Sequence, residues 1–185
     1  MKGIVFTEFL ELVEDRFGLE VADRIIQASD LPSGGVYTSV GTYDHHELLQ
    51  LVSHLSTAAQ VAVPDLLRTF GEYLFGRFVV GYPRFFEGVQ TTFHFLMQIE
   101  SHIHTEVRKL YPDAELPRFE YKRLAADHLE LLYHSSRPLA DFAEGLIRGC
   151  IKHFREQIEL ERVDLPDEHG TTARFLLTHT ERVSC

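Results

Sequence analysis

The first 110 residues carry repeated short stretches of helical periodicity. Apolar side chains at Val5, Phe9, Leu12 and Val13 recur every three or four residues, and Gly18 offers a C-cap where this helix ends. The same spacing predicts four more helices, at residues 22–28, 45–59, 65–82 and 92–110. We therefore expect a helical N-terminal portion, with neither an internal repeat nor a low-complexity linker.

In the remainder of the chain, apolar and polar residues mostly alternate. The segment FEYKRLAADHLELLYHSS predicts two strands around a polar turn at residues 125–128, with Leu129, Leu131 and Tyr133 on one face. A helix follows at residues 138–157, and the segments IELERVDL and TTARFLLTHT predict a second strand pair around the turn PDEHG. The fold class is therefore α+β, with a small antiparallel sheet on which helices pack.

The composition restricts the classes of function. The chain has 185 residues, of which 44% are hydrophobic, and this suffices for one globular domain over residues 1–185. A net charge of −10 disfavours binding to nucleic acid or anionic lipid. Acidic residues interrupt the N-terminal apolar run, so we expect no membrane span. Cys150 and Cys185 are the only cysteines, which argues against a disulfide framework or a cysteine-rich zinc site and indicates a cytoplasmic protein.

The 11 histidines include one pair with the spacing H-x-H, His102 and His104, within the predicted helix 92–110. Two residues apart on a helix, their side chains diverge by about 200° and cannot share a metal ion. His104 lies on the helix edge that also carries Phe93 and Met97, so it is the more apolar of the two positions. The pattern allows a buried core histidine or the single axial ligand of a macrocyclic cofactor, and alone it favours the first.

A second group of polar residues follows in the segment YHSSRPL. On an extended chain, Tyr133, Ser135 and Arg137 point to one side, which brings a phenol, a hydroxyl and a guanidinium together. These donors suit a dicarboxylate, because arginine binds carboxylate oxygens in a bidentate manner. The alternative is that this segment only caps the following helix, with Pro138 in its first turn, and the motif alone favours that interpretation.

A helical histidine followed about 30 residues later by Y-x-S-x-R resembles the H-NOX family of heme-nitric oxide/oxygen-binding domains. The resemblance covers nearly the whole chain, in the segments MKGIVF, FGEYLFG, FLMQIESHIHTEVRKLYPDAELPRF and YHSSRPLADFAEGLIRGCIKHF. In the family, the ligating histidine lies eight residues before a frequent proline, in a segment that ends in P-x-F. His104 has this offset from Pro112, whereas His102 does not.

The resemblance implies a heme b between a helical distal subdomain and a proximal subdomain that contains the antiparallel sheet. His104 would be the only protein ligand of the iron. Tyr133, Ser135 and Arg137 would bind the propionates, and Pro117 would press on the macrocycle and distort it.

The resemblance also implies which gas is bound. Family members that bind oxygen stably carry a tyrosine where this chain has Phe142, because bound oxygen gains from a hydrogen-bond donor. The other aligned distal positions are apolar, namely Val5, Phe9, Leu74 and Leu146. This pattern predicts a sensor that binds nitric oxide, and also carbon monoxide, and excludes oxygen, although entry of Tyr73 into the pocket is left open.

The route of the signal follows from the same resemblance. Nitric oxide would weaken the bond to His104, the heme would relax from the Pro117 distortion, and the helix of His104 would move. About 180 residues of sensor leave no room for an output module, so we expect no enzymatic activity in this chain. The expected partner is a separate histidine kinase or a cyclic-di-GMP enzyme, a diguanylate cyclase or phosphodiesterase.

Three other interpretations compete with a nitric oxide sensor. A heme enzyme or an oxygen-binding heme protein would need distal polar groups, which His54, His94 or His153 could supply. A non-heme metal site would use the histidine pair together with carboxylates. A cofactor-free interaction domain would use none of these groups. The absorption spectrum distinguishes these interpretations, because a nitric oxide sensor should show a ferrous Soret band that shifts with nitric oxide but not in air.

Overall fold

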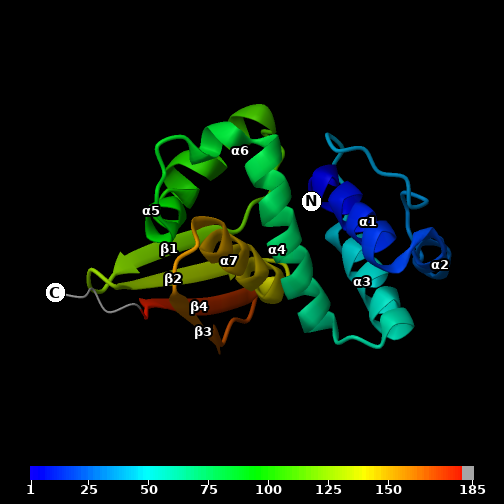
Figure 1. Cartoon of the computed structure of the whole chain (residues 1–185). Coiled ribbons are helices and arrows are strands. Elements are labelled where there is room, and N and C mark those ends of the chain that lie inside the picture. Colours follow the sequence, from blue (N-terminus) through cyan, green and yellow to red (C-terminus); the bar gives the residue numbers. More distant parts are fainter. Residues whose placement is uncertain (181–185) are drawn as a thin grey trace.

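A computed structural model describes residues 1–180; Cys185 lies outside the described residues. Four helices form the N-terminal part: α1 (Gly3–Phe17), α2 (Leu19–Ala28), α3 (His45–Ala59) and α4 (Val63–Gly81). Figure 1 shows α1, α2 and α3 grouped on one side of the long helix α4, and the sheet on the other side. Asp44 caps α3, because its carboxylate accepts the backbone N–H of His46 at 3.0 Å.

The predicted helix 92–110 is not regular in the structure. After the short 3₁₀ helix η1 (Pro83–Phe86), the chain forms α5 (Thr92–Met97), the π-helical turn η2 (Ile99–Ile103) and α6 (His104–Leu110). Within the π turn, the backbone N–H of Ile103 donates to the carbonyl of Gln98 at 3.2 Å. The wider turn rotates the residues that follow it, and such turns are frequent at functional sites.

The C-terminal part contains an antiparallel sheet and one long helix. Its elements are β1 (Arg118–Arg123), β2 (His128–Ser135), α7 (Ala140–Phe154), β3 (Ile158–Leu165) and β4 (Thr171–His179), with the strand order β1-β2-β4-β3. As Figure 1 shows, α7 lies against the sheet and beside α4. The predicted α+β class is therefore confirmed.

Two hydrophobic cores correspond to the two parts of the chain. The first lies among α1 to α4 and includes Phe6, Phe9 and Phe70. The second lies between the sheet and α7, where Leu129 and Leu131 are fully buried as their alternation predicts. Helix α4 contributes buried residues to both cores, and Leu146 of α7 packs against both of them.

Helices α4 and α7 approach closely because glycines lie at their contact. A Cβ atom at Gly145 would lie 2.2 Å from the carbonyl oxygen of Arg68, and one at Gly71 would lie 2.4 Å from the carbonyl oxygen of Phe142. Asp141 accepts hydrogen bonds from Arg68 of α4, at 2.5 Å, and from Arg162 of β3, at 2.8 Å. These contacts fix α7 against α4 and the sheet.

Within residues 1–180, no helix combines the length and apolarity that a bilayer crossing demands.

Candidate functional site

A large apolar cavity lies where the two parts of the molecule meet. Its lining comes from α1, α4, the segment from α5 to α6, β1, β2 and α7. The empty space amounts to about 1580 Å³, part of it open to solvent. The lining is almost entirely apolar, so the cavity suits a ligand that is itself mostly apolar.

His104 lies in the wall of this cavity, directly after the π turn. The imidazole is largely buried, with 12% of the side chain exposed, and its Nδ1 lies 2.7 Å from Oε1 of Glu100. Burial lowers the pKa of His104, while the neighbouring Glu100 opposes this effect. The Nε2 atom makes no hydrogen bond within residues 1–180. It is therefore the ring nitrogen that is available to a metal ion.

His104 lines the cavity together with Ile99, Ile103 and Val107 of the apolar stripe. His102 is exposed, and its ring contacts that of Phe85 at a centroid distance of 6.1 Å. The two histidines therefore do not form a shared metal site.

The cavity is also lined by the end of β2 and the residues just after it. These lining residues are Tyr133, Ser135 and Arg137. The hydroxyl of Ser135 accepts the backbone N–H of Arg137 at 3.1 Å. Burial raises the pKa of the Tyr133 phenol. The guanidinium of Arg137 is 9% exposed and donates to Glu115, both to its backbone carbonyl, at 2.8 Å, and to its carboxylate. The three side chains therefore converge, and Arg137 already binds a carboxylate.

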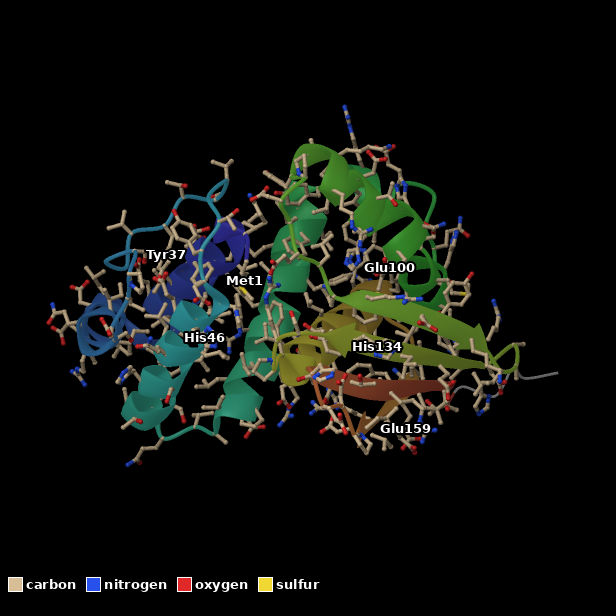
Figure 2. All side chains as sticks on the ribbon, turned by 180° about the vertical axis from the view of Figure 1, so that it is seen from behind. Met1, Tyr37, His46, Glu100, His134 and Glu159 are labelled. Atoms are coloured by element: carbon tan, nitrogen blue, oxygen red, sulfur yellow. The ribbon has the colours of Figure 1, made fainter. Side chains whose placement is uncertain are left out.

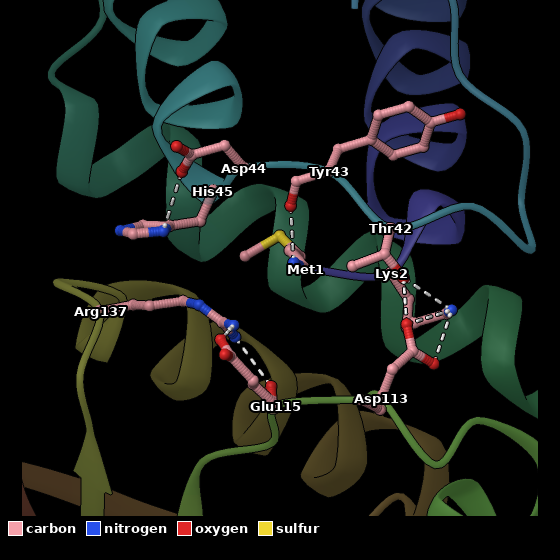
Figure 3. Close-up of a pocket in the computed structure, with 10 residues that line it drawn as sticks. Met1, Lys2, Thr42, Tyr43, Asp44, His45, Asp113, Glu115 and Arg137 are labelled. Atoms are coloured by element: carbon pink, nitrogen blue, oxygen red, sulfur yellow. Dashed lines mark hydrogen bonds and ion pairs between the residues drawn. The ribbon is translucent and has the colours of Figure 1, made fainter.

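The cavity rim beside Arg137 joins the N-terminus to the segment that follows α6. Figure 3 shows Lys2 and Thr42 on Asp113, and Arg137 on Glu115. The hydroxyl of Thr42 donates to Asp113 at 2.6 Å, and Nζ of Lys2 lies 3.5 Å from the same carboxylate. The start of α1 is thus tied to the end of the segment that carries His104.

Four of the predicted distal residues line the cavity, namely Val5, Leu74, Phe142 and Leu146, and Pro117 lines it as well. Phe9 is the exception. It is buried in the N-terminal core, where its ring contacts Phe70 at 5.2 Å, and Phe70 in turn stacks on Phe142 at 5.1 Å. Phe9 therefore lies one layer behind the wall, because the ring of Phe70 separates it from Phe142.

The polar side chains that the sequence left open as distal groups do not line the cavity, whereas another tyrosine does. Tyr73 is not among the residues that line the cavity within the described chain, and neither are His54, His94 and His153. Tyr82, at the end of α4, does line it; burial raises its pKa, and the charged and titratable groups that face it are Tyr111 and Glu8.

Two residues of the site were not found from the sequence. Glu100 lies four residues before His104, a spacing that places both on one side of a helix, and this was the available signal. Glu115 carried no local signal, because its partner Arg137 lies 22 residues further along the chain.

The chain belongs to the haem-NO-binding family, whose model matches residues 2–162. This is the H-NOX family of heme-binding gas sensor domains, as the resemblance in the sequence predicted. No curated protein sequence matches the chain.

Solved H-NOX structures share the whole fold. The Fe(II) unliganded protein from K. algicida is 44% identical with a TM-score of 0.92, and the match covers 100% of both chains. The IWP-051-bound protein from Shewanella woodyi, in the Fe(II)CO state, is 44% identical with a TM-score of 0.84, covering 100% of this chain and 97% of that one. The protein from S. oneidensis, in the Fe(II)NO state, is 25% identical with a TM-score of 0.89, covering 98% and 100%.

The residues of the cavity fit the heme that the family binds. The lining is almost entirely apolar, which suits the macrocycle, and one wall holds the imidazole of His104, whose Nε2 makes no hydrogen bond within residues 1–180. Two hydroxyls and a guanidinium lie at the polar end, where they suit the two propionates.

Proposed function

We propose that this protein is a nitric oxide sensor that holds heme b through His104 and excludes oxygen. One observation carries the proposal: the wall formed by α1, α4 and α7 presents Val5, Leu74, Phe142 and Leu146 to the cavity, and none of these side chains has a hydrogen-bond donor. The tyrosines that line the cavity are Tyr82, Tyr111 and Tyr133, and none of them belongs to α1, α4 or α7.

The proximal residues hold the cofactor in this proposal. His104 binds the iron through Nε2, while Tyr133, Ser135 and Arg137 bind the propionates. The pairing of Arg137 with Glu115 supports this role, because a propionate would replace one carboxylate with another at the same guanidinium. Pro117 lines the cavity and would press on the macrocycle from its position before β1.

When bound, heme would supply a ferrous iron that is held by His104 and that binds nitric oxide or carbon monoxide, and binding of nitric oxide would weaken the hold of His104 on the iron. The apolar wall would discriminate between gases because oxygen, which acquires partial negative charge when it is bound, would find no hydrogen-bond donor there. Release of His104 frees α6 to move. The contacts of Asp113 with Lys2 and Thr42 then carry this movement to the start of α1.

From the start of α1, the signal passes to a separate protein, a histidine kinase or a cyclic-di-GMP enzyme. The chain itself would then act by changing the population of two conformations, and not by catalysis.

The absorption spectrum of the ferrous protein tests the proposal. We expect a Soret band that shifts with nitric oxide and with carbon monoxide, and that stays unchanged in air over the time of the titration. A band that shifts in air to that of an oxygen complex would contradict the exclusion of oxygen. A colourless protein from cells supplied with heme would contradict the cofactor assignment.

A further inference from the structure

The carboxylate of Glu100 contacts two parts of the proximal wall with a single oxygen. Oε1 lies 2.7 Å from Nδ1 of His104, and it accepts the backbone N–H of Phe119 at 3.0 Å. Figure 2 shows Glu100 beside the strand β1, to which Phe119 belongs. The same oxygen therefore connects the helix of His104 with the strand that begins just after Pro117.

The position of Glu100 is fixed by the π turn. The backbone N–H of His104 donates to the carbonyl of Ile99, so the carbonyl of Glu100 does not receive its usual helical bond from this residue. The hydroxyl of Thr105 donates to that carbonyl at 3.0 Å. Both the backbone and the side chain of Glu100 are thus held in place, which is unlike a freely rotating surface carboxylate.

The contact with Glu100 determines which nitrogen of His104 carries the proton. An ionised carboxylate only accepts hydrogen bonds, so Nδ1 carries the proton and the lone pair lies on Nε2. Histidine ligands of metals commonly donate the other N–H to a carboxylate, which fixes the ring and makes the ligand more basic. Oε2 of Glu100 lies 3.6 Å from the half-exposed Arg108, a pair too solvated to compete strongly with the contact to His104.

A simpler explanation is that Glu100 only stabilises its helix through a side-chain pair four residues apart, an effect of about 0.2–0.5 kcal/mol. Glu106 offers the matched case, because it pairs with Lys109 on the exposed side of the same helical segment. Unlike Glu106, Glu100 also contacts β1 and a ring in the cavity wall. If Glu100 only stabilised the helix, replacing Glu100 or Glu106 should have the same effect on the heme spectrum. If Glu100 acts on the ligand His104, only its replacement should change the spectrum.

We propose that Glu100 is a positioning residue for the proximal ligand: its carboxylate fixes the Nδ1–H form of His104 and strengthens the bond of Nε2 to the heme iron. Glu100 therefore sets how readily His104 is released. Through Phe119, it also links that release to the strand after Pro117. This inference rests on the proposed function, because it requires His104 to ligate heme.

The first test uses the heme-loaded, full-length protein with Glu100→Gln, Glu100→Asp and the control Glu106→Gln. The readouts are the iron–histidine stretching band of the ferrous protein and the ferric/ferrous midpoint potential. We expect Glu100→Gln to shift the band to lower frequency and the potential to a higher value. Glu100→Asp keeps the charge and should restore part of both shifts, and Glu106→Gln should match the wild type.

A second test removes any dependence on how Glu100→Gln affects the fold. In His104→Gly protein supplied with imidazole, the free ligand keeps an N–H for Glu100, whereas 1-methylimidazole lacks it. We expect Glu100→Gln in this background to weaken imidazole binding about tenfold, and to leave 1-methylimidazole binding unchanged. Equal effects on both ligands would overturn the proposal.

The failure of the proposed function and the failure of the role of Glu100 give different results. A wild-type protein that shows no iron–histidine band would overturn the proposed function and this inference with it. A wild-type band that remains at the same frequency in Glu100→Gln would leave His104 as the ligand and overturn only the role of Glu100.

Discussion

The two walls of the cavity differ in their chemistry and in the part of the chain that builds them. The wall from α1, α4 and α7 is formed by apolar side chains such as Val5 and Phe142. The wall from α6 to β2 carries His104 and the polar group that ends in Arg137. Under the proposed function, holding the cofactor and selecting the gas fall to different segments, so a substitution in one wall should leave the function of the other intact.

The largest effect is expected from removing the single ligand of the polar wall. His104→Gly should abolish heme uptake unless imidazole is supplied, because no other imidazole in residues 1–180 lines the cavity. The Soret absorbance of the purified protein measures this. His102→Gly is the control and should retain heme, and retention of an unchanged ferrous spectrum by His104→Gly would refute the ligand assignment.

The next effect comes from making the apolar wall polar. Phe142→Tyr adds a hydroxyl to a ring that lines the cavity, and a hydrogen bond to a charged group contributes about 1.5–3 kcal/mol. We expect oxygen affinity to rise about 10- to 100-fold, measured by equilibration of the ferrous protein with oxygen. Tyr82→Phe should leave oxygen exclusion unchanged. No gain of oxygen binding in Phe142→Tyr would mean that exclusion has another cause.

The contact between α4 and α7 keeps the apolar wall in place. Gly145→Ala would set a methyl group 2.2 Å from a backbone oxygen of α4, so the helices must separate, at a cost of about 1–3 kcal/mol. Urea unfolding of the heme-loaded protein measures the loss. Gly76→Ala has nothing within 4 Å of the added Cβ and should instead stabilise α4 by up to about 1 kcal/mol.

The smallest effect is expected at the polar rim. In the proposed site, Arg137→Gln would remove a charge-assisted hydrogen bond to a propionate but leave Tyr133 and Ser135, so heme loss should accelerate about tenfold. Transfer of heme to an excess of a high-affinity acceptor measures the rate. Arg118→Gln alters an exposed arginine that pairs with Glu120 and should not change the rate. Equal rates in all three proteins would show that Arg137 does not hold the propionates.

The fold was largely predictable because its periodicities are strong. The alternation of Leu129, Leu131 and Tyr133 identified the buried face of β2, and the helices of the N-terminal part appeared near their predicted bounds. The π turn at Ile99–Ile103 was not predicted, since it arises from a change of backbone hydrogen bonds that leaves the apolar spacing intact.

The candidate site was predictable to a different extent in each wall. The sequence pattern left His104 as a core residue or a ligand, and only the resemblance selected the second interpretation. Glu115 on Arg137 depends on tertiary contacts, for which the sequence had no signal. Phe9 shared the spacing of the wall residues, but the ring of Phe70 covers it.

The most direct test of the two-wall account is an experimental structure of the ferrous, heme-loaded protein. We expect the iron bound to Nε2 of His104, the propionates against Tyr133, Ser135 and Arg137, and only carbon atoms of the α1, α4 and α7 side chains facing the open position of the iron. A different protein ligand, or a tyrosine hydroxyl directed at that open position, would contradict it.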